Sequence, residues 1–171
     1  MAATRLSRPE LTWLFAHELG LQVTDLKRFD GRKRFQKLIY LLQHPPFSRD
    51  FGYRYNLYIH GPYSPDLAAD GYEVAGAPDR FERVTHTYRL KPQAKQAVDD
   101  LKKRFQKNAA WNSAFLEFCA TVHFLYHHTY VYVPARERLE LVRRAATGMK
   151  PHLSQRLDEC IAVLRDAEML H

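Results

Sequence analysis

The sequence contains few of the residues that build disulfide scaffolds or phosphate-binding loops, with two cysteines and seven glycines among 171 residues. Two cysteines cannot supply a disulfide framework in place of a core, and we expect Cys119 and Cys160 to be small core residues of helices. A G-x-S-x-G motif and a glycine-rich phosphate loop are also missing. These absences argue against hydrolases and nucleotide-binding enzymes, so we expect a protein without catalytic activity or cofactor.

No apolar run is long enough to suggest a membrane span. The longest run, from Val122 to Val133, is interrupted by three histidines and a threonine, whereas a span needs about 20 apolar residues. The N-terminus, MAATRLSRPEL, carries charges where a signal peptide has its apolar core. We therefore expect a cytoplasmic protein that does not contact the membrane.

The positive charge is confined to the first two thirds of the chain. Residues 1–110 hold 19 Lys and Arg against 12 Asp and Glu, a net charge of +7, whereas residues 111–171 hold seven of each. Apolar residues make up 46% of the sequence, which is enough for a packed core. A basic surface on a globular protein attracts nucleic acid or an acidic protein partner.

The first half of the sequence predicts three helices and a strand. Ser7 and Glu10 form a capping-box pattern that opens a helix ending at Gly20. Asp30 can cap a second helix, Gly31–Gln43, and Ser64-Pro65 opens a short helix that ends at Gly76. Between these two helices, apolar and aromatic residues alternate over Phe51–Ile59, which is strand periodicity.

The second half predicts a further strand and then helices only. Phe81–Leu90 alternates and could be the wing of a winged helix, and Pro92 opens the next helix. Apolar spacing beyond Asn108 predicts three more helices. The fold class is mainly α with a small β-hairpin (α+β), in which a winged-helix-like basic domain (1–108) precedes a C-terminal helical extension (109–171) for packing or homodimerisation.

Two segments carry a resemblance to a known family. RKRFQKLIYLLQ followed by FGYRYNLYIHGPYSPDLAAD resembles the Panacea, or SocA-like, antitoxin-associated family over about residues 30–100. The resemblance implies a winged-helix-like fold and, as in some members, neutralisation or adaptor delivery of a toxin by direct contact. His60 departs from the tyrosine that is common before Gly-Pro. The positions that match the family motif are Gln36, Lys37, Tyr40, Gly61, Pro62, Tyr63 and Ser64.

The basic residues are candidates for contacting the partner, either nucleic acid or an acidic, toxin-like protein. The helix that would read a DNA groove, from Pro65 onward, carries Asp66, Asp70 and Glu73 and no Lys or Arg, which disfavours sequence-specific reading. Phosphate contacts without base reading remain open, and Tyr58 and Tyr63, if exposed, could stack on bases. The candidate contact residues are Lys27, Arg28, Arg32, Lys33, Arg34, Lys37, Arg83 and Arg89.

Two weaker hypotheses concern metal ions. Asp66, Asp70 and Glu82 could form the carboxylate set of a metal-dependent nuclease, although no E-x-K strand accompanies them. Separately, Cys119, His123 and His127 are spaced i, i+4, i+8, which could bring zinc ligands together. Successive members of this set drift around a helix by about 40°, so we interpret the histidines as interface or surface residues.

Overall fold

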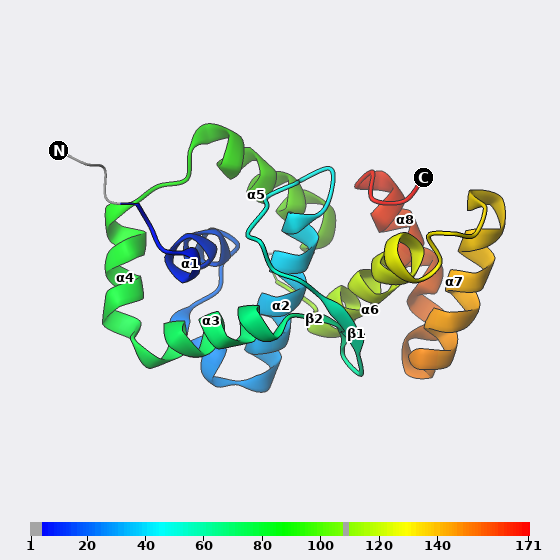
Figure 1. Ribbon diagram of the computed structural model, residues 1–171, viewed down its shortest axis with the longest axis horizontal. Coiled ribbons are helices and arrows are strands. Elements are labelled where there is room, and N and C mark those ends of the chain that lie inside the picture. The colour runs from blue at the N-terminus through cyan, green and yellow to red at the C-terminus, as the bar shows by residue number, and fades with distance from the viewer. Residues whose placement is uncertain (1–4, 108–109) are drawn as a thin grey trace.

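The protein is mainly α-helical with one small β-hairpin, as the sequence predicts. The computed structural model describes residues 5–107 and 110–171. Helix α2 lies at the centre, with α1, α3 and α4 on one side and α6, α7 and α8 on the other (Figure 1). The helices are α1 (Arg8–Glu18), η1 (Val23–Lys27), α2 (Phe29–Gln43), α3 (Pro65–Gly76), α4 (Pro78–Thr87), α5 (Pro92–Phe105), α6 (Ser113–Phe124), the π-helical turn η2 (Leu125–Thr129), α7 (Ala135–Met149), η3 (Pro151–Arg156) and α8 (Leu157–Asp166).

Helix α2 is buried on nearly all sides and organises the core. Its side chains from Phe35 to Leu42 are buried, and α2 packs against α6, η1, α3 and the hairpin. One continuous hydrophobic cluster includes side chains from α1 through α8. The predicted boundary between residues 108 and 109 lies outside the described residues, and the predicted self-association of the C-terminal helices stays a prediction.

The hairpin is shorter than the predicted strand Phe51–Ile59. Strand β1 (Asn56–Tyr58) pairs antiparallel with β2 (Gly61–Tyr63), with Asn56 opposite Tyr63. Phe51 and Tyr53 are buried, as the alternation predicts. Their segment is not a strand, however, because Tyr53 bonds through its backbone N–H and C=O to the side-chain amide of Gln43, at 3.3 and 2.7 Å, instead of to another strand. The prediction is wrong for residues 51–55.

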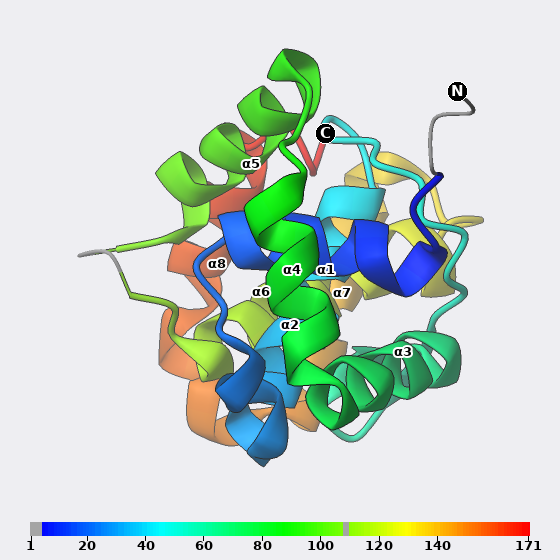
Figure 2. The same ribbon diagram turned by 90° about the vertical axis from the view of Figure 1, so that its left-hand side faces the viewer.

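The predicted wing at Phe81–Leu90 is also wrong, because this segment forms α4 and the turn after it. Pro78 occupies the first turn of α4, where proline is well tolerated. Phe81 and Val84, three residues apart, are its buried positions, whereas Glu82 is exposed. Helix α4 passes in front of α1 in the view of Figure 2. Arg83 and Arg89 therefore lie on and just after a helix, and not on a wing.

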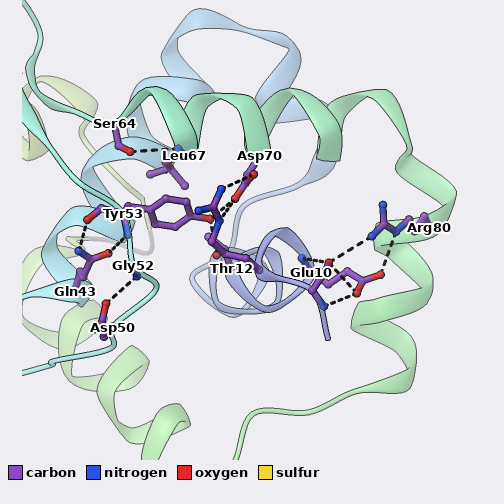
Figure 3. Close-up of polar contacts among 12 residues, drawn as sticks. Glu10, Thr12, Gln43, Asp50, Gly52, Tyr53, Ser64, Leu67, Asp70 and Arg80 are labelled. Carbon is purple, nitrogen blue, oxygen red and sulfur yellow. Dashed lines mark hydrogen bonds and ion pairs between the residues drawn. The ribbon is translucent and has the colours of Figure 1, made fainter. Parts of the chain in front are cut away.

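A buried polar network joins α1 to α3 (Figure 3). The carboxylate of Asp70 accepts hydrogen bonds from Arg8 Nε at 2.8 Å and from Tyr53 Oη at 2.7 Å. The hydroxyl of Tyr53 also lies 2.8 Å from that of Thr12. The predicted capping box is confirmed, because Ser7 N donates to Glu10 Oε2 at 2.9 Å and Glu10 N donates to Ser7 Oγ.

In the described parts of the chain, no helix is long and apolar enough to cross a membrane.

Four histidines gather where the end of α2 meets α6 and η2. The ring of His123 is buried, and its Nδ1 lies 2.7 Å from the hydroxyl of Tyr40. The Nε2 atoms of His44 and His128 lie 3.3 Å apart, and the ring centroids of His123 and His127 lie 4.4 Å apart. Burial is the largest cause that lowers the pKa of each of the four, and neighbouring charged groups, mostly the other histidines, lower it further.

This cluster predicts a loss of stability in mild acid. The folded-state pKa values lie below the unfolded value of about 6.5, so the unfolded chain binds more protons and stability falls as pH falls through that value. We expect the urea midpoint to drop between pH 7 and pH 5.5. The double variant His44→Gln/His128→Gln should show a smaller drop in the urea midpoint. The control His152→Gln, which replaces an exposed histidine of η3, should show the same drop as the wild type. Equal pH dependence in all three proteins would contradict this account.

Candidate functional site

The two segments that carry the family resemblance are joined directly by hydrogen bonds. The side-chain amide of Gln36 donates to Ser64 O at 2.8 Å and accepts from Ser64 N at 3.0 Å. One residue along α2, Lys37 Nζ donates to Pro62 O at 2.6 Å. The buried side chains of α2 thus bind the backbone of the hairpin and the start of α3, so the two halves of the motif form one structural unit.

Gly61 allows the hairpin to approach α6 closely. Its φ of +83° lies in the left-handed region that side chains disfavour, and a Cβ atom there would lie 2.8 Å from Thr121 Oγ1. Tyr40, the remaining motif residue on α2, is fully buried and reaches α6 through its bond to His123. Both residues hold the hairpin, α2 and α6 together.

A buried charge cluster lies beneath the hairpin. Glu117 of α6 is only 4% exposed and pairs with Lys33 Nζ at 3.0 Å and with Lys150 Nζ. Burial alone would raise the pKa of Glu117, but the hydrogen bonds from Lys150 and Lys33 outweigh this effect and lower it. Lys150 also donates to Ile59 O in the hairpin turn, and His60 Nδ1 lies 3.7 Å from Glu117 Oε2.

Lys37 is a buried cation without a carboxylate of its own. The residue is 2% exposed, and within the described residues its Nζ has no Asp or Glu oxygen within 4.0 Å. Burial lowers the pKa of Lys37 to about 7; Glu117 opposes this shift, and the charges of Lys150 and Lys33 add to it. The ammonium group is therefore partly discharged at neutral pH.

A pocket of about 360 Å³ opens between α2, the hairpin and α3, and we call it the hairpin pocket. Its walls contain Gln36, Gly61 and Tyr63 of the family motif. Of the nine large hydrophobic side chains that are exposed in the described residues, five line this pocket. The five are Phe29, Tyr58, Ile59, Tyr63 and Tyr72.

The charged residues of the hairpin pocket all have the same sign. Arg32, Lys33 and Lys37 line it together with His60, and the lining contains no Asp or Glu. The guanidinium of Arg32 lies 5.7 Å from the ring centre of Tyr72, in a cation–π arrangement, and donates to Leu26 O. The pocket thus combines apolar walls with positive charge, and its volume lies within the roughly 300 to 1,000 Å³ of typical ligand sites.

The other predicted contact residues do not form a single basic face. Arg34 pairs with Asp25 and Asp30, and Arg28 pairs with Asp25. Lys27 and Arg28 are exposed beside the start of α2. Arg83 and Arg89 are also exposed, but they belong to α4 and the residues after it and do not line the hairpin pocket. Of the predicted basic contact residues, only Arg32, Lys33 and Lys37 therefore line the pocket together with residues of the family motif.

The residues of the two metal hypotheses have other partners. Asp70 is bound by Arg8 and Tyr53, as described above, whereas Asp66 and Glu82 are exposed on different helices. Cys119 is buried beside Cys160 of α8. Residues 5–107 and 110–171 contain no group of three or more His, Cys, Asp or Glu side chains arranged to hold a metal ion.

Sequence reasoning did not select Phe29, Tyr72, Glu117 or Lys150, which complete the site. Glu117 gave one signal, because it is the only charged residue in the apolar helix SAFLEFCATVHF apart from its histidine. Lys150 follows the end of a helix and gave no such signal.

Comparisons of the chain with models of known families, with curated proteins and with solved structures found no match. The resemblance to the Panacea family therefore stays a prediction.

The close approach at Gly61 can be tested by adding a single methyl group. We expect Gly61→Ala to lower the free energy of unfolding by about 2 kcal/mol, because the backbone strain adds to the clash with Thr121. Gly148→Ala is the matched control: this glycine lies inside α7 with nothing within 4 Å of a built Cβ, so the change should stabilise by about 0.5 kcal/mol. Urea denaturation measures both, and equal effects would contradict the packing described.

Proposed function

We propose that this chain is a non-enzymatic binding protein that holds a short segment of a partner protein in the hairpin pocket. The observation that carries the proposal is the concentration of exposed aromatic and aliphatic side chains around one pocket. Exposed apolar patches of this kind mark interaction sites, and aromatic residues beside arginine are the residue types that dominate binding energy at protein interfaces.

The charge of the pocket favours an acidic partner segment. Arg32, Lys33, Lys37 and His60 surround the apolar walls without an opposing carboxylate in the lining. Complementary charge speeds association and selects the partner. The resemblance to antitoxin-associated proteins supports the same class of function, with a co-encoded, toxin-like protein as the partner. The free thiols of Cys119 and Cys160 fit a reducing compartment, and we propose the cytoplasm.

Variants of exposed pocket residues test this proposal without disturbing the core. We expect Tyr72→Ala and Ile59→Ala, at residues that are 60% and 79% exposed, to weaken binding to the co-purifying partner at least about tenfold, as loss of an interface anchor does. Tyr132→Ala removes an aromatic ring that is 96% exposed outside the pocket and should change nothing. The affinity is measured by titration calorimetry with the purified partner. Pocket variants that bind as tightly as the wild type would overturn the proposal.

The second candidate function is binding of single-stranded nucleic acid. Tyr58 and Tyr63 are exposed on the pocket wall, with ring centroids 5.4 Å apart, and Lys27 and Arg28 are exposed near the same end of α2. Exposed aromatic rings beside a basic surface stack on bases while the cations bind phosphates. This arrangement supports binding without sequence reading.

Salt dependence separates this candidate from the first. The logarithm of the affinity for a labelled mixed-sequence DNA strand should fall linearly with the logarithm of salt concentration, and Lys27→Ala/Arg28→Ala should reduce the slope by about 1.4, or 0.7 for each contact. Arg136→Ala/Arg144→Ala removes two exposed charges of α7 and serves as the control. A slope that is identical in all three proteins would exclude the proposed phosphate contacts.

A further inference from the structure

The buried charge cluster beneath the hairpin has more positive than negative charge. Lys33, Lys37 and Lys150 surround the single carboxylate of Glu117, and both carboxylate oxygens are already used. Oε1 accepts from Lys150, and Oε2 lies 3.0 Å from Lys33 Nζ. Lys37 therefore has only Pro62 O as a partner among the described residues, although an ammonium group has three N–H donors.

A buried cation without a counter-ion is unfavourable unless something else supplies the negative charge. Lys37 is 2% exposed, so water screens its charge poorly, yet its side chain forms part of the pocket lining. Lys33 and Lys37 are the two lysines of the cluster that line the pocket, and of these Lys37 is the one that lacks a carboxylate. An anion bound in the pocket would supply the negative charge that Lys37 lacks. The lowered pKa of Lys37 agrees with this picture, because burial disfavours the charged form and the attraction of Glu117 offsets this effect only in part.

The rest of the lining defines what must accompany the anion. Phe35, Ala68 and Gly71 line the pocket together with the aromatic rings of its mouth. A Cβ atom on Gly71 would lie 3.1 Å from the ring of Phe35, so α2 and α3 are close together on this wall. The pocket therefore has room for an apolar group at least as large as an aromatic side chain, and the anion must be attached to that group.

We propose that Lys37 is the receptor for a carboxylate of the partner segment, and that the hairpin pocket holds the apolar group next to that carboxylate. This inference rests on the proposed function, because it names the chemistry of the segment that the pocket binds. The carboxylate is a C-terminus or an acidic side chain beside an aliphatic or aromatic residue. Its oxygens accept the hydrogen bonds that Lys37 does not make within the protein.

Two small probes of the same shape separate the charge from the apolar group. Phenylacetate carries an aromatic ring and a carboxylate, whereas phenylacetamide has the same ring and a neutral amide. We expect the full chain at pH 6.5 to bind phenylacetate at least tenfold more tightly than phenylacetamide, as measured by NMR titration. In Lys37→Met, which keeps an unbranched apolar side chain, the preference should vanish and phenylacetamide should still bind. Lys27→Met, an exposed lysine outside the pocket, is the control.

The pH dependence of phenylacetate binding distinguishes a lysine that binds the carboxylate from one with a structural role only. Lys37 loses its charge as pH rises through about 7, so the affinity for phenylacetate should fall between pH 6 and pH 8.5 while that for phenylacetamide stays constant. Lys33, Lys150 and Glu117 also face this site, and His60 Nδ1 lies 3.7 Å from Glu117 Oε2. The His60→Asn variant controls for this histidine and should keep the pH dependence.

A readout on the unaltered chain covers the case in which Lys37→Met does not fold. Bound phenylacetate should raise the pKa of Lys37, measured from the NMR signals of labelled lysine side chains, whereas phenylacetamide should leave it unchanged. Equal affinity for the two probes, or an unchanged Lys37 pKa with phenylacetate bound, would overturn the carboxylate receptor but leave the apolar docking site intact. Failure of the Tyr72 and Ile59 variants to weaken partner binding would instead overturn the proposed function itself.

Discussion

The structure depends on the polar side chains that α2 places inside the core. Gln36, Lys37 and Tyr40 are buried, and their hydrogen-bond partners lie on two other parts of the chain: Ser64 and Pro62 at the end of the hairpin, and His123 of α6. A buried polar group without a partner costs about 1 to 3 kcal/mol, so these three residues fix where the hairpin and α6 can lie. Gly61 makes the arrangement sterically possible, because only a residue without a side chain fits between the hairpin and α6.

The same hydrogen bonds position the walls of the pocket. Gln36 and Lys37 hold the backbone of β2 and the start of α3 next to α2, and the pocket opens between these elements. Tyr58 and Ile59 stay exposed beside Tyr72 of α3, and Arg32 holds its position against that ring. The charge cluster of Glu117 then ties the C-terminal half, through Lys150, to the underside of the hairpin.

The sequence predicted elements where local signals agree with tertiary packing. The Ser7 capping box and the Ser64-Pro65 helix start are local features, and both are present. Residues 81–90 alternate in polarity and contain β-branched residues, yet Pro78 and the buried pair Phe81 and Val84 make a helix that packs on α1. The family resemblance coupled the two motif segments, but the pairing of Glu117 with Lys33 and Lys150 joins residues that are 84 and 33 positions apart, which no local pattern encodes.

Stability alone does not account for the lysine at position 37. A methionine there would fill a similar volume without the cost of desolvating an ammonium group, and replacing buried charges with apolar residues is often neutral or stabilising. The single hydrogen bond to Pro62 O recovers only part of that cost, about 1.5 to 3 kcal/mol for a bond that involves a charged group. Positions where a protein keeps an unfavourable local choice tend to be functional. The one buried lysine without a carboxylate partner in the described chain also lines the hairpin pocket with its exposed aromatic rings, and a ligand that carries both an anion and an apolar group explains the two features together.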